Sequence, residues 1–187
     1  GFTVGANNSV NKSSDPLVSW NWKANGSGAA NTAGSINTTK TSAETTSGCS
    51  IITYTGNGSS GATIGHGMGI KPSMILVKEL AGGNDWIVYT QALTANKILY
   101  LNTSGGENDN SVFFNDTEPT TSLITLGSIG ATNGNGVAMV AYCFSNVQGF
   151  SKQGSYLGNG STDGTFVYTG FSPACVIMKC SSSGSTP

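Results

Sequence analysis

Two stretches of the chain repeat each other, and this repetition constrains the fold more than any other feature of the sequence. Residues 54–78 return as residues 156–179, and both copies begin with Tyr-x-Gly-Asn-Gly-Ser. Residues 2–22 match residues 124–144 at one constant offset, without a gap. The first match joins the openings of a unit, and the second joins its endings. The period of roughly a hundred residues is that of a small domain, so we predict tandem domains rather than a solenoid.

The two matches divide the chain into four parts. We predict that residues 1–22 are the end of a preceding unit, that 48–147 are a complete unit, and that 148–187 are the truncated opening of the next. Residues 23–47 have Ile36 as their single large apolar side chain and cannot bury enough surface to offset the entropy of ordering them. We interpret residues 23–47 as a linker. The alternative is an extended arm held by another subunit or by flanking domains.

The last unit is predicted to be incomplete in this chain. Lys78 is followed by a Gly-rich loop and the aromatic segment 86–89, whereas Lys179 is followed by a Ser-rich stretch. Residues 175–178 would then lack a sequence neighbour, and their unpaired backbone groups must be covered. We expect further polypeptide, or residues 2–22 of another subunit, to supply the missing strands.

Short segments rich in β-branched and aromatic residues predict an all-β fold, and no segment keeps a helical period for long. The predicted strands are residues 50–54, 74–77, 86–89, 98–101, 112–114, 123–126, 137–144, 165–168 and 175–178.

Asn-Gly pairs favour tight hairpin turns because Asn and Gly tolerate positive φ at low cost. Such pairs begin at Asn57, Asn133, Asn135 and Asn159. We therefore predict tandem β-sandwich domains of jelly-roll-like form, with no significant helix. Residues 50–78 and 155–179 are expected to contain matching hairpins.

Charged residues are scarce, and this scarcity excludes several classes of partner. They make up 9% of the chain, the net charge is -1, and all eight basic residues are lysine. Arg is preferred for bidentate phosphate contacts, so we expect neither nucleic acid nor a membrane surface as partner. The apolar run 137–144 is far shorter than the roughly 20 residues of a membrane-spanning helix. Loops filled with Asn, Ser, Thr and Gly are typical of an exposed β-rich adhesin or fibre.

Two sequence motifs suggest a binding or catalytic site, but the residues around them do not support one. Residues 56–61 spell the dinucleotide-binding pattern, but residues 62–69 and Pro72 cannot form the helix that this motif requires. We predict a turn there instead. His66 is the only histidine and has no counterpart near Thr169 in the second copy, so we interpret it as structural or solvent-facing.

Acidic residues and cysteines do not predict a metal or catalytic site. Four acids cluster between predicted strands: Glu107, Asp109, Asp116 and Glu118. Nothing would bury one carboxyl group and raise its pKa, as a glycosidase requires, so we interpret them as solvated turn residues. A calcium loop at residues 107–110 is the alternative.

The four cysteines are Cys49, Cys143, Cys175 and Cys180. They lack metal-ligand spacing, and we interpret them as buried free thiols. Their disulfide state stays open.

Aromatic residues are the remaining candidates, because aromatic rings can stack on sugars. The set comprises Trp20, Trp22, Trp86, Tyr89, Tyr100, Phe113 and Phe114. Trp20 and Trp22 lie two apart and share a strand face, and the matching Tyr142 and Phe144 keep that face aromatic. We expect this face to pack in a core, and no glycan-binding residue is assigned.

Several of these motifs together resemble a known family. They are Trp20-Asn-Trp-Lys-Ala24, the Gly-His-Gly block of residues 63–69, the Gly-Asn-Gly-Ser blocks, residues 140–144, and residues 149–156. The chain resembles a repeated domain of unknown function in large virion proteins of marine tailed bacteriophages, often found beside concanavalin-like lectin domains. Cys175 and Cys180 stand where that family has an aromatic or aliphatic residue and a basic residue. The family has no known catalytic residues, so the resemblance implies a tail-associated structural role, with cell-surface glycan binding as a further implication.

We therefore predict a non-enzymatic structural segment of a phage tail fibre or virion appendage, located in the virion. Its expected partners are further copies of itself, in a homo-oligomer or filament, and a host-surface glycan. No catalytic, cofactor or metal residue is predicted. The alternative is a carbohydrate-binding or filament-forming module of a secreted bacterial surface protein, and a depolymerase is the third hypothesis.

Overall fold

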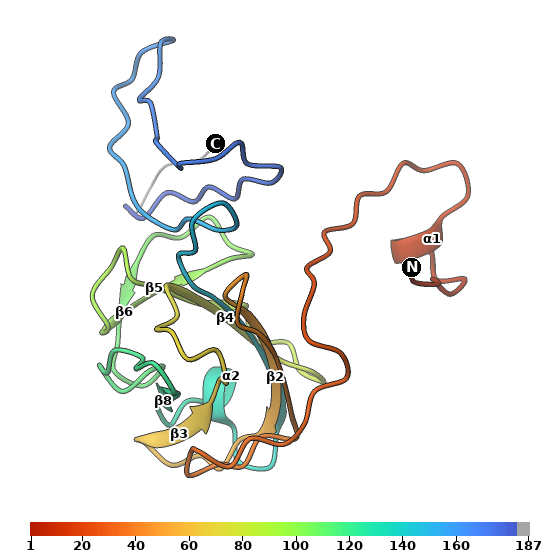
Figure 1. The fold of residues 1–187 in the computed structure, drawn as a ribbon, viewed down its shortest axis with the longest axis vertical. Coiled ribbons are helices and arrows are strands. Elements are labelled where there is room, and N and C mark those ends of the chain that lie inside the picture. The colour runs from red at the N-terminus through yellow and green to blue at the C-terminus, as the bar shows by residue number, and fades with distance from the viewer. Residues whose placement is uncertain (183–187) are drawn as a thin grey trace.

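The computed structural model describes residues 1–182, and its centre is a sandwich of two antiparallel sheets (Figure 1). The strands are β1 (Lys40–Glu44), β2 (Cys49–Thr55), β3 (Ala62–Gly65), β4 (Met74–Glu79), β5 (Ile87–Thr90), β6 (Lys97–Tyr100), β7 (Asn108–Asp109), β8 (Leu123–Leu126) and β9 (Ala138–Phe144). The larger sheet has seven strands in the order β1-β2-β9-β4-β5-β6-β7, and β3 pairs with β8 in the smaller one. The predicted β fold is confirmed.

Helical structure is limited to two short turns, α1 (Asn8–Asn11) and α2 (Gly130–Asn133). Neither reaches two turns, and the described residues contain no helix long and apolar enough to cross a membrane. The expectation of no significant helix is therefore met within the described part of the chain.

The core lies between the two sheets and follows the alternation of side chains along each strand. In β4, Ile75 and Val77 point inward and are buried, whereas their neighbours are only partly covered. Ile64 and Leu126 face them from the smaller sheet as members of the same cluster. This alternation is why short apolar segments were sufficient to predict most strands.

The last strand lies at the centre of the larger sheet. β9 pairs along its whole length with β2 on one side and with β4 on the other, and β2 and β4 do not pair with each other. Met139, Ala141 and Cys143 point into the core, as the continuous apolar run predicts for a buried strand.

Most predicted strands are confirmed, and three are not. Residues 50–54, 74–77, 86–89, 98–101, 123–126 and 137–144 coincide with β2, β4, β5, β6, β8 and β9 to within about a residue or two, the usual uncertainty of a strand boundary. Residues 112–114 form turns that send Phe113 and Phe114 into the core. Residues 165–168 and 175–178 form no strand.

The predicted hairpins at Asn-Gly pairs are wrong. Asn57-Gly58 connects β2 to β3, which belong to different sheets, and the Gly58 N–H donates to the Asn133 carbonyl at 2.8 Å. Asn133 to Gly136 lead from α2 into β9, again without a hairpin. The sequence therefore identified the turns, but their hydrogen-bond partners are distant in sequence. The prediction of matching hairpins in residues 50–78 and 155–179 is also wrong: β2, β3 and β4 do not pair with one another, and residues 155–179 form no strand.

The interpretation of residues 23–47 as a linker is also corrected. They contain β1, which pairs with β2, and Ile36 lies in the core. Backbone and hydroxyl hydrogen bonds order the rest: the Asn31 N–H donates to the Thr38 hydroxyl at 2.8 Å, and Ala29 bridges to Thr41. Apolar content alone underestimated the segment because strand pairing satisfies polar backbone groups without large side chains.

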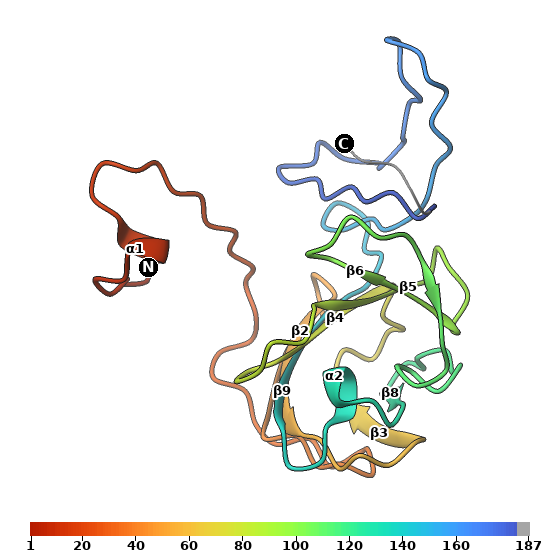
Figure 2. The same cartoon turned by 180° about the vertical axis from the view of Figure 1, so that it is seen from behind.

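Residues 1–22 extend away from the sandwich, as Figures 1 and 2 show from opposite sides. Residues 148–182 lie at one end of it and return to it near Lys179, whose ammonium donates to the Thr103 and Gly105 carbonyls at 2.8 and 2.7 Å. Most side chains of these two terminal segments are exposed. The predicted division into units at 1–22, 48–147 and 148–187 stays a prediction, and residues 183–187 of the last part lie outside the described residues.

Candidate functional site

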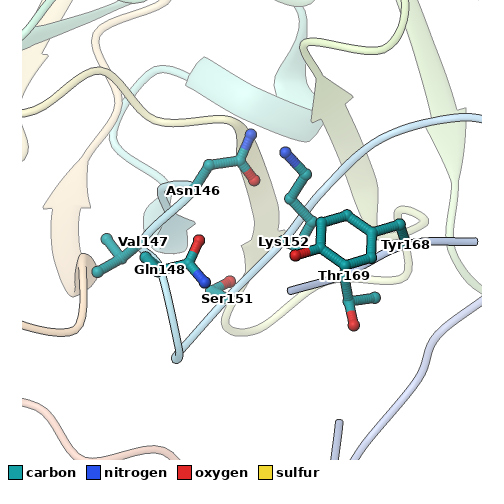
Figure 3. Close-up of a pocket in the computed structure, with 7 residues that line it drawn as sticks. All are labelled: Asn146, Val147, Gln148, Ser151, Lys152, Tyr168 and Thr169. Atoms are coloured by element: carbon teal, nitrogen blue, oxygen red, sulfur yellow. The ribbon is translucent and has the colours of Figure 1, made fainter. Parts of the chain in front are cut away.

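Two adjacent hollows lie where the terminal segments leave the sandwich, and they share Ser151. The first has a volume of about 280 Å³, and Figure 3 shows the residues that line it: Asn146, Val147, Gln148, Ser151, Lys152, Tyr168 and Thr169. The second has a volume of about 480 Å³ and is bounded by both terminal segments and the ends of the sheet. It is lined by Asn21, Trp22, Lys23, Glu44, Thr46, Ser47, Cys49, Phe144, Phe150 and Ser151.

Aromatic rings and mixed polar groups define the larger hollow. The rings of Trp22 and Phe144 lie 5.6 Å apart in a tilted arrangement. The carboxylate of Glu44 accepts a hydrogen bond from the Thr46 N–H at 3.0 Å, and this bond lowers the pKa of Glu44. Glu44 is the one carboxylate among the residues that line this hollow, which also include the Lys23 ammonium and the Cys49 thiol.

Polar groups around the smaller hollow are held mainly by the chain itself. The Gln148 side-chain N–H donates to the Gly170 carbonyl at 3.1 Å, and the Gln153 N–H donates to the Asn146 side chain at 2.6 Å. These bonds tie the start of the C-terminal segment to its middle. Sequence reasoning missed these residues because their contacts depend on chain folding far from any motif.

His66 is buried and fully hydrogen-bonded, which confirms the structural interpretation and excludes the solvent-facing one. Its Nε2 donates to the Thr120 carbonyl at 3.3 Å, and its Nδ1 accepts from the Met68 N–H at 3.3 Å. Burial lowers the pKa of His66, although the bond to Thr120 opposes this shift. The imidazole therefore serves as a neutral link between two loops.

We expect this burial to make stability depend on pH just below neutrality. The unfolded histidine binds a proton near pH 6.5, and the folded one does so only at lower pH, so the unfolded state holds more protons in that window. The contribution of neutral His66 to the free energy of unfolding should be fully present above about pH 6.5, and it should be lost as the pH falls below that value. Urea unfolding between about pH 5.5 and 7.5 measures it, and His66→Gln should flatten the profile because the chain has no other histidine. If the dependence of stability on pH were unchanged in His66→Gln, a group other than His66 would be its cause.

The four acids are dispersed among structural contacts. Glu107 forms an ion pair with Lys97, and Asp109 accepts a hydrogen bond from the Asn96 side chain at 2.8 Å. No group of three or more metal-ligating side chains is present among residues 1–182, so no observation favours the calcium loop. Asp116 is exposed with positive φ, in agreement with the predicted turn.

Glu118 connects two parts of the sandwich. Its carboxylate accepts from the Lys71 ammonium at 2.6 Å and from the Tyr89 hydroxyl at 2.7 Å. Burial opposes ionisation of Glu118, but these two bonds outweigh it and lower the pKa of the carboxyl group. A lowered pKa is the opposite of what a general acid needs.

The interpretation of the cysteines as buried thiols holds for Cys49 and Cys143, which lie in adjacent strands. Burial raises the pKa of both thiols, and proximity to Cys49 adds to the shift of Cys143. Cys175 and Cys180 are exposed, and no disulfide is formed. The two buried thiols behave as small apolar side chains.

The aromatic candidates separate into three groups. Tyr89, Phe113 and Phe114 are buried in the core as expected. Tyr100 and Trp86 are half-buried, each against a neighbouring ring. The remaining pair, Trp20 and Trp22, is not in the core: Trp20 is 67% exposed, and Trp22 lies on the outer face of the larger sheet.

A buried polar junction joins the two sheets near α2. The Asn133 side chain donates to the carbonyls of Gly127 at 2.9 Å and Ser59 at 3.0 Å and accepts from the Asn57 N–H at 2.9 Å. Beside it, the Tyr54 hydroxyl donates to the Thr132 carbonyl at 2.5 Å. Sequence reasoning did not assign this junction, although the signal was present.

That signal is the repeat itself. Asn133 matches Asn11, Gly127 matches Gly5, and Tyr54 matches Tyr156. Because side chains with a buried hydrogen-bonding role tolerate little change, their recurrence could have identified the junction.

Comparisons with known proteins place the chain in a family without a described activity. No curated protein and no solved structure matches it significantly. One family model matches residues 1–186, nearly the whole sequence. The chain therefore belongs to the family described as a domain of unknown function, DUF7483.

Proposed function

We propose that this chain is a non-enzymatic structural segment of a phage tail fibre or other virion appendage, built from tandem β-sandwich units. One observation carries the proposal: the offset that relates residues 2–22 to 124–144 also relates α1 to α2. The chain thus repeats a structural element as well as a sequence. Arrays of small β domains suit extended appendages because each unit contacts mainly its neighbours.

The distribution of reactive groups supports the non-enzymatic part of this proposal. His66 has both ring nitrogens engaged, and Glu118 is held ionised by Lys71 and Tyr89. Neither faces a hollow with a second catalytic group. A depolymerase would need two carboxyl groups flanking one bond, with the pKa of one of them raised.

The surface composition supports an exposed, extracellular location. A net charge of -1 with 9% charged residues leaves solubility to Asn, Ser, Thr and Gly. Such a surface attracts neither polyphosphates nor anionic membranes strongly. It therefore suits a particle that must diffuse without adhering to unrelated polymers.

Immunogold labelling of particles from the natural source tests the proposal. Antibodies raised against residues 29–147 should label an appendage, and mass spectrometry of purified particles should recover peptides of the chain. Recovery only from a secreted, particle-free fraction would overturn the viral assignment and support the bacterial surface module.

The carbohydrate-binding alternative is favoured by the larger hollow, where Trp22, Phe144 and Phe150 lie among amide and charged groups. Aromatic rings with adjacent hydrogen-bonding groups are suited to sugar rings. A glycan array discriminates between the hypotheses: binding that is lost in Trp22→Ala and kept in Trp86→Ala would place a sugar site there. The homo-oligomer expected from the sequence stays a prediction.

A further inference from the structure

The terminal segments expose side chains whose counterparts in the sandwich are buried. Tyr156 is 51% exposed, whereas its counterpart Tyr54 is 1% exposed. Met178 is 72% exposed, whereas its counterpart Val77 is fully buried. Further exposed apolar side chains in these segments include Phe2, Leu17, Val18, Leu157, Phe166 and Ile177. This is more apolar surface than isolated segments normally expose, and it indicates an interaction surface.

The two terminal segments correspond to different parts of the sandwich. Residues 2–22 correspond to β8, α2 and β9, and residues 151–179 correspond to β2, β3 and β4. In the sandwich, β9 lies between β2 and β4, and β8 pairs with β3. Together the two segments therefore contain the sequence counterparts of five strands of the sandwich.

The register of the sandwich gives the pairing of the segments. Phe144 at the end of β9 faces Cys49 of β2 and Met74 of β4. Transferred through the two matches, this register places Trp22 between Ser151 and Cys175.

The closeness of Trp22 and Ser151 in the structure supports this register and indicates that both segments belong to the same chain. Trp22 and Ser151 already line the same hollow in the structure. The two residues that the register places side by side thus lie together at the point where both segments leave the sandwich. Because segments held so close in one chain meet at a high effective concentration, closure within the chain is favoured over exchange between chains.

Changes on one segment are matched by changes on the other. In the sandwich, Cys143 faces Ser50. The transferred register places Asn21 opposite Lys152 at the corresponding positions, so a hydrogen-bond acceptor would face a donor. Gly154 replaces the larger Ile52 opposite Ser19.

On the other side of Ser19, Met178 replaces the smaller Val77 and restores volume. The facing surfaces therefore remain complementary although neither copies the sandwich residue by residue.

The residue types of the polar junction also recur in the two segments. Asn11 and Tyr156 correspond to Asn133 and Tyr54, and Gly5 corresponds to Gly127. In the same arrangement, the Asn11 side chain donates to the Gly5 and Ser161 carbonyls, and the Tyr156 hydroxyl donates to the carbonyl of the first helical turn.

We propose that residues 2–22 pair with residues 151–179 of the same chain, with residues 18–22 inserted between the counterparts of β2 and β4, to form a second, smaller sandwich that closes the shared hollow. The proposal concerns how the chain folds on itself. It can therefore fail while the proposed function stands, and the particle labelling described above is independent of it.

A single cysteine tests the register because Cys175 supplies the second thiol. Trp22→Cys places a thiol directly across from Cys175, at the separation of about 5 Å that antiparallel neighbours have and a disulfide requires. Ser19→Cys is the matched control, about 10 Å further along the strand. Under mild oxidation of the dilute full chain, Trp22→Cys should give the intrachain bond to Cys175 roughly ten times faster than Ser19→Cys, measured by peptide mapping.

The competing outcomes are distinct. Equal rates for the two variants would overturn the register. A disulfide that joins two chains, in both variants or in Trp22→Cys alone, would overturn closure within the chain and assign the same strands to a second copy.

A second measurement does not depend on cysteine chemistry. Amide exchange of residues 18–22 should be protected in the full chain, and Asn11→Ala should speed that exchange by roughly tenfold while leaving β2 and β9 protected. Ser9→Ala is the control, because the Ser9 side chain has no counterpart in the junction. Unprotected amides at residues 18–22 in the unsubstituted chain would refute the proposal.

Discussion

Gly127→Ala should be among the most destabilising single substitutions in the sandwich. A Cβ atom at Gly127 would lie 1.9 Å from the Val112 carbonyl oxygen and 2.9 Å from the Phe113 nitrogen, so the backbone at the edge of β8 must move. The atoms in the way are backbone atoms, so no flexible side chain can move to relieve the clash. We expect a loss of about 3 kcal/mol or more in the free energy of unfolding. Urea unfolding followed by far-ultraviolet circular dichroism measures it.

Gly130→Ala is the matched control. It lies three residues further along, and a Cβ atom there meets nothing within 4 Å. Its unfolding free energy should stay within about 1 kcal/mol of the unsubstituted chain. Similar losses in both variants would show that loss of glycine flexibility, rather than the contact with Val112, causes the effect.

Asn133→Ala should have the second large effect because it removes the hydrogen-bond partner of one buried and two partly buried backbone groups. The side chain holds the Gly127 and Ser59 carbonyls and the Asn57 N–H. An unsatisfied buried group costs about 1 to 3 kcal/mol and a partly exposed one costs less, so the free energy of unfolding should fall by about 2 to 4 kcal/mol. The same urea titration applies.

Two further substitutions separate hydrogen bonding from packing. Asn133→Asp keeps an acceptor for Asn57 but cannot donate to either carbonyl when ionised, and it should be at least as harmful as Asn133→Ala. The exposed Asn135→Ala should change stability by less than about 0.5 kcal/mol. If Asn133→Ala were as mild as Asn135→Ala, the junction would not hold the sheets together.

Most strands could be predicted from local pattern because their side chains alternate between core and surface. Ile75 and Val77 in β4 illustrate this: their spacing of two and their apolar character are sufficient. For His66 the sequence left a structural and a solvent-facing role open, and its burial depends on Thr120, which is distant in sequence.

What could not be predicted depends on contacts distant in sequence. The Asn57-Gly58 turn looks like a hairpin, but both of its N–H groups donate to Asn133, which local turn rules do not include. β1 is rich in Thr and Ser and became a strand because β2 offered a free edge. The hollow around Trp22 forms where residues 21–23 and residues 144–151 lie close together, so no local motif could indicate it.

The central position of β9 has a consequence for synthesis. Ribosomes release β2 and β4 well before β9, and these strands have no pairing with each other to form in the meantime. The larger sheet can therefore be completed only when residue 144 has left the exit tunnel, and the apolar faces of β2 and β4 stay uncovered until then. In a nascent chain that contains several such units, a finished β9 from one unit could be captured by the waiting strands of the next. The differences at Ser19 and Asn21 relative to Ala141 and Cys143 make such capture less favourable, because polar side chains would enter an apolar core.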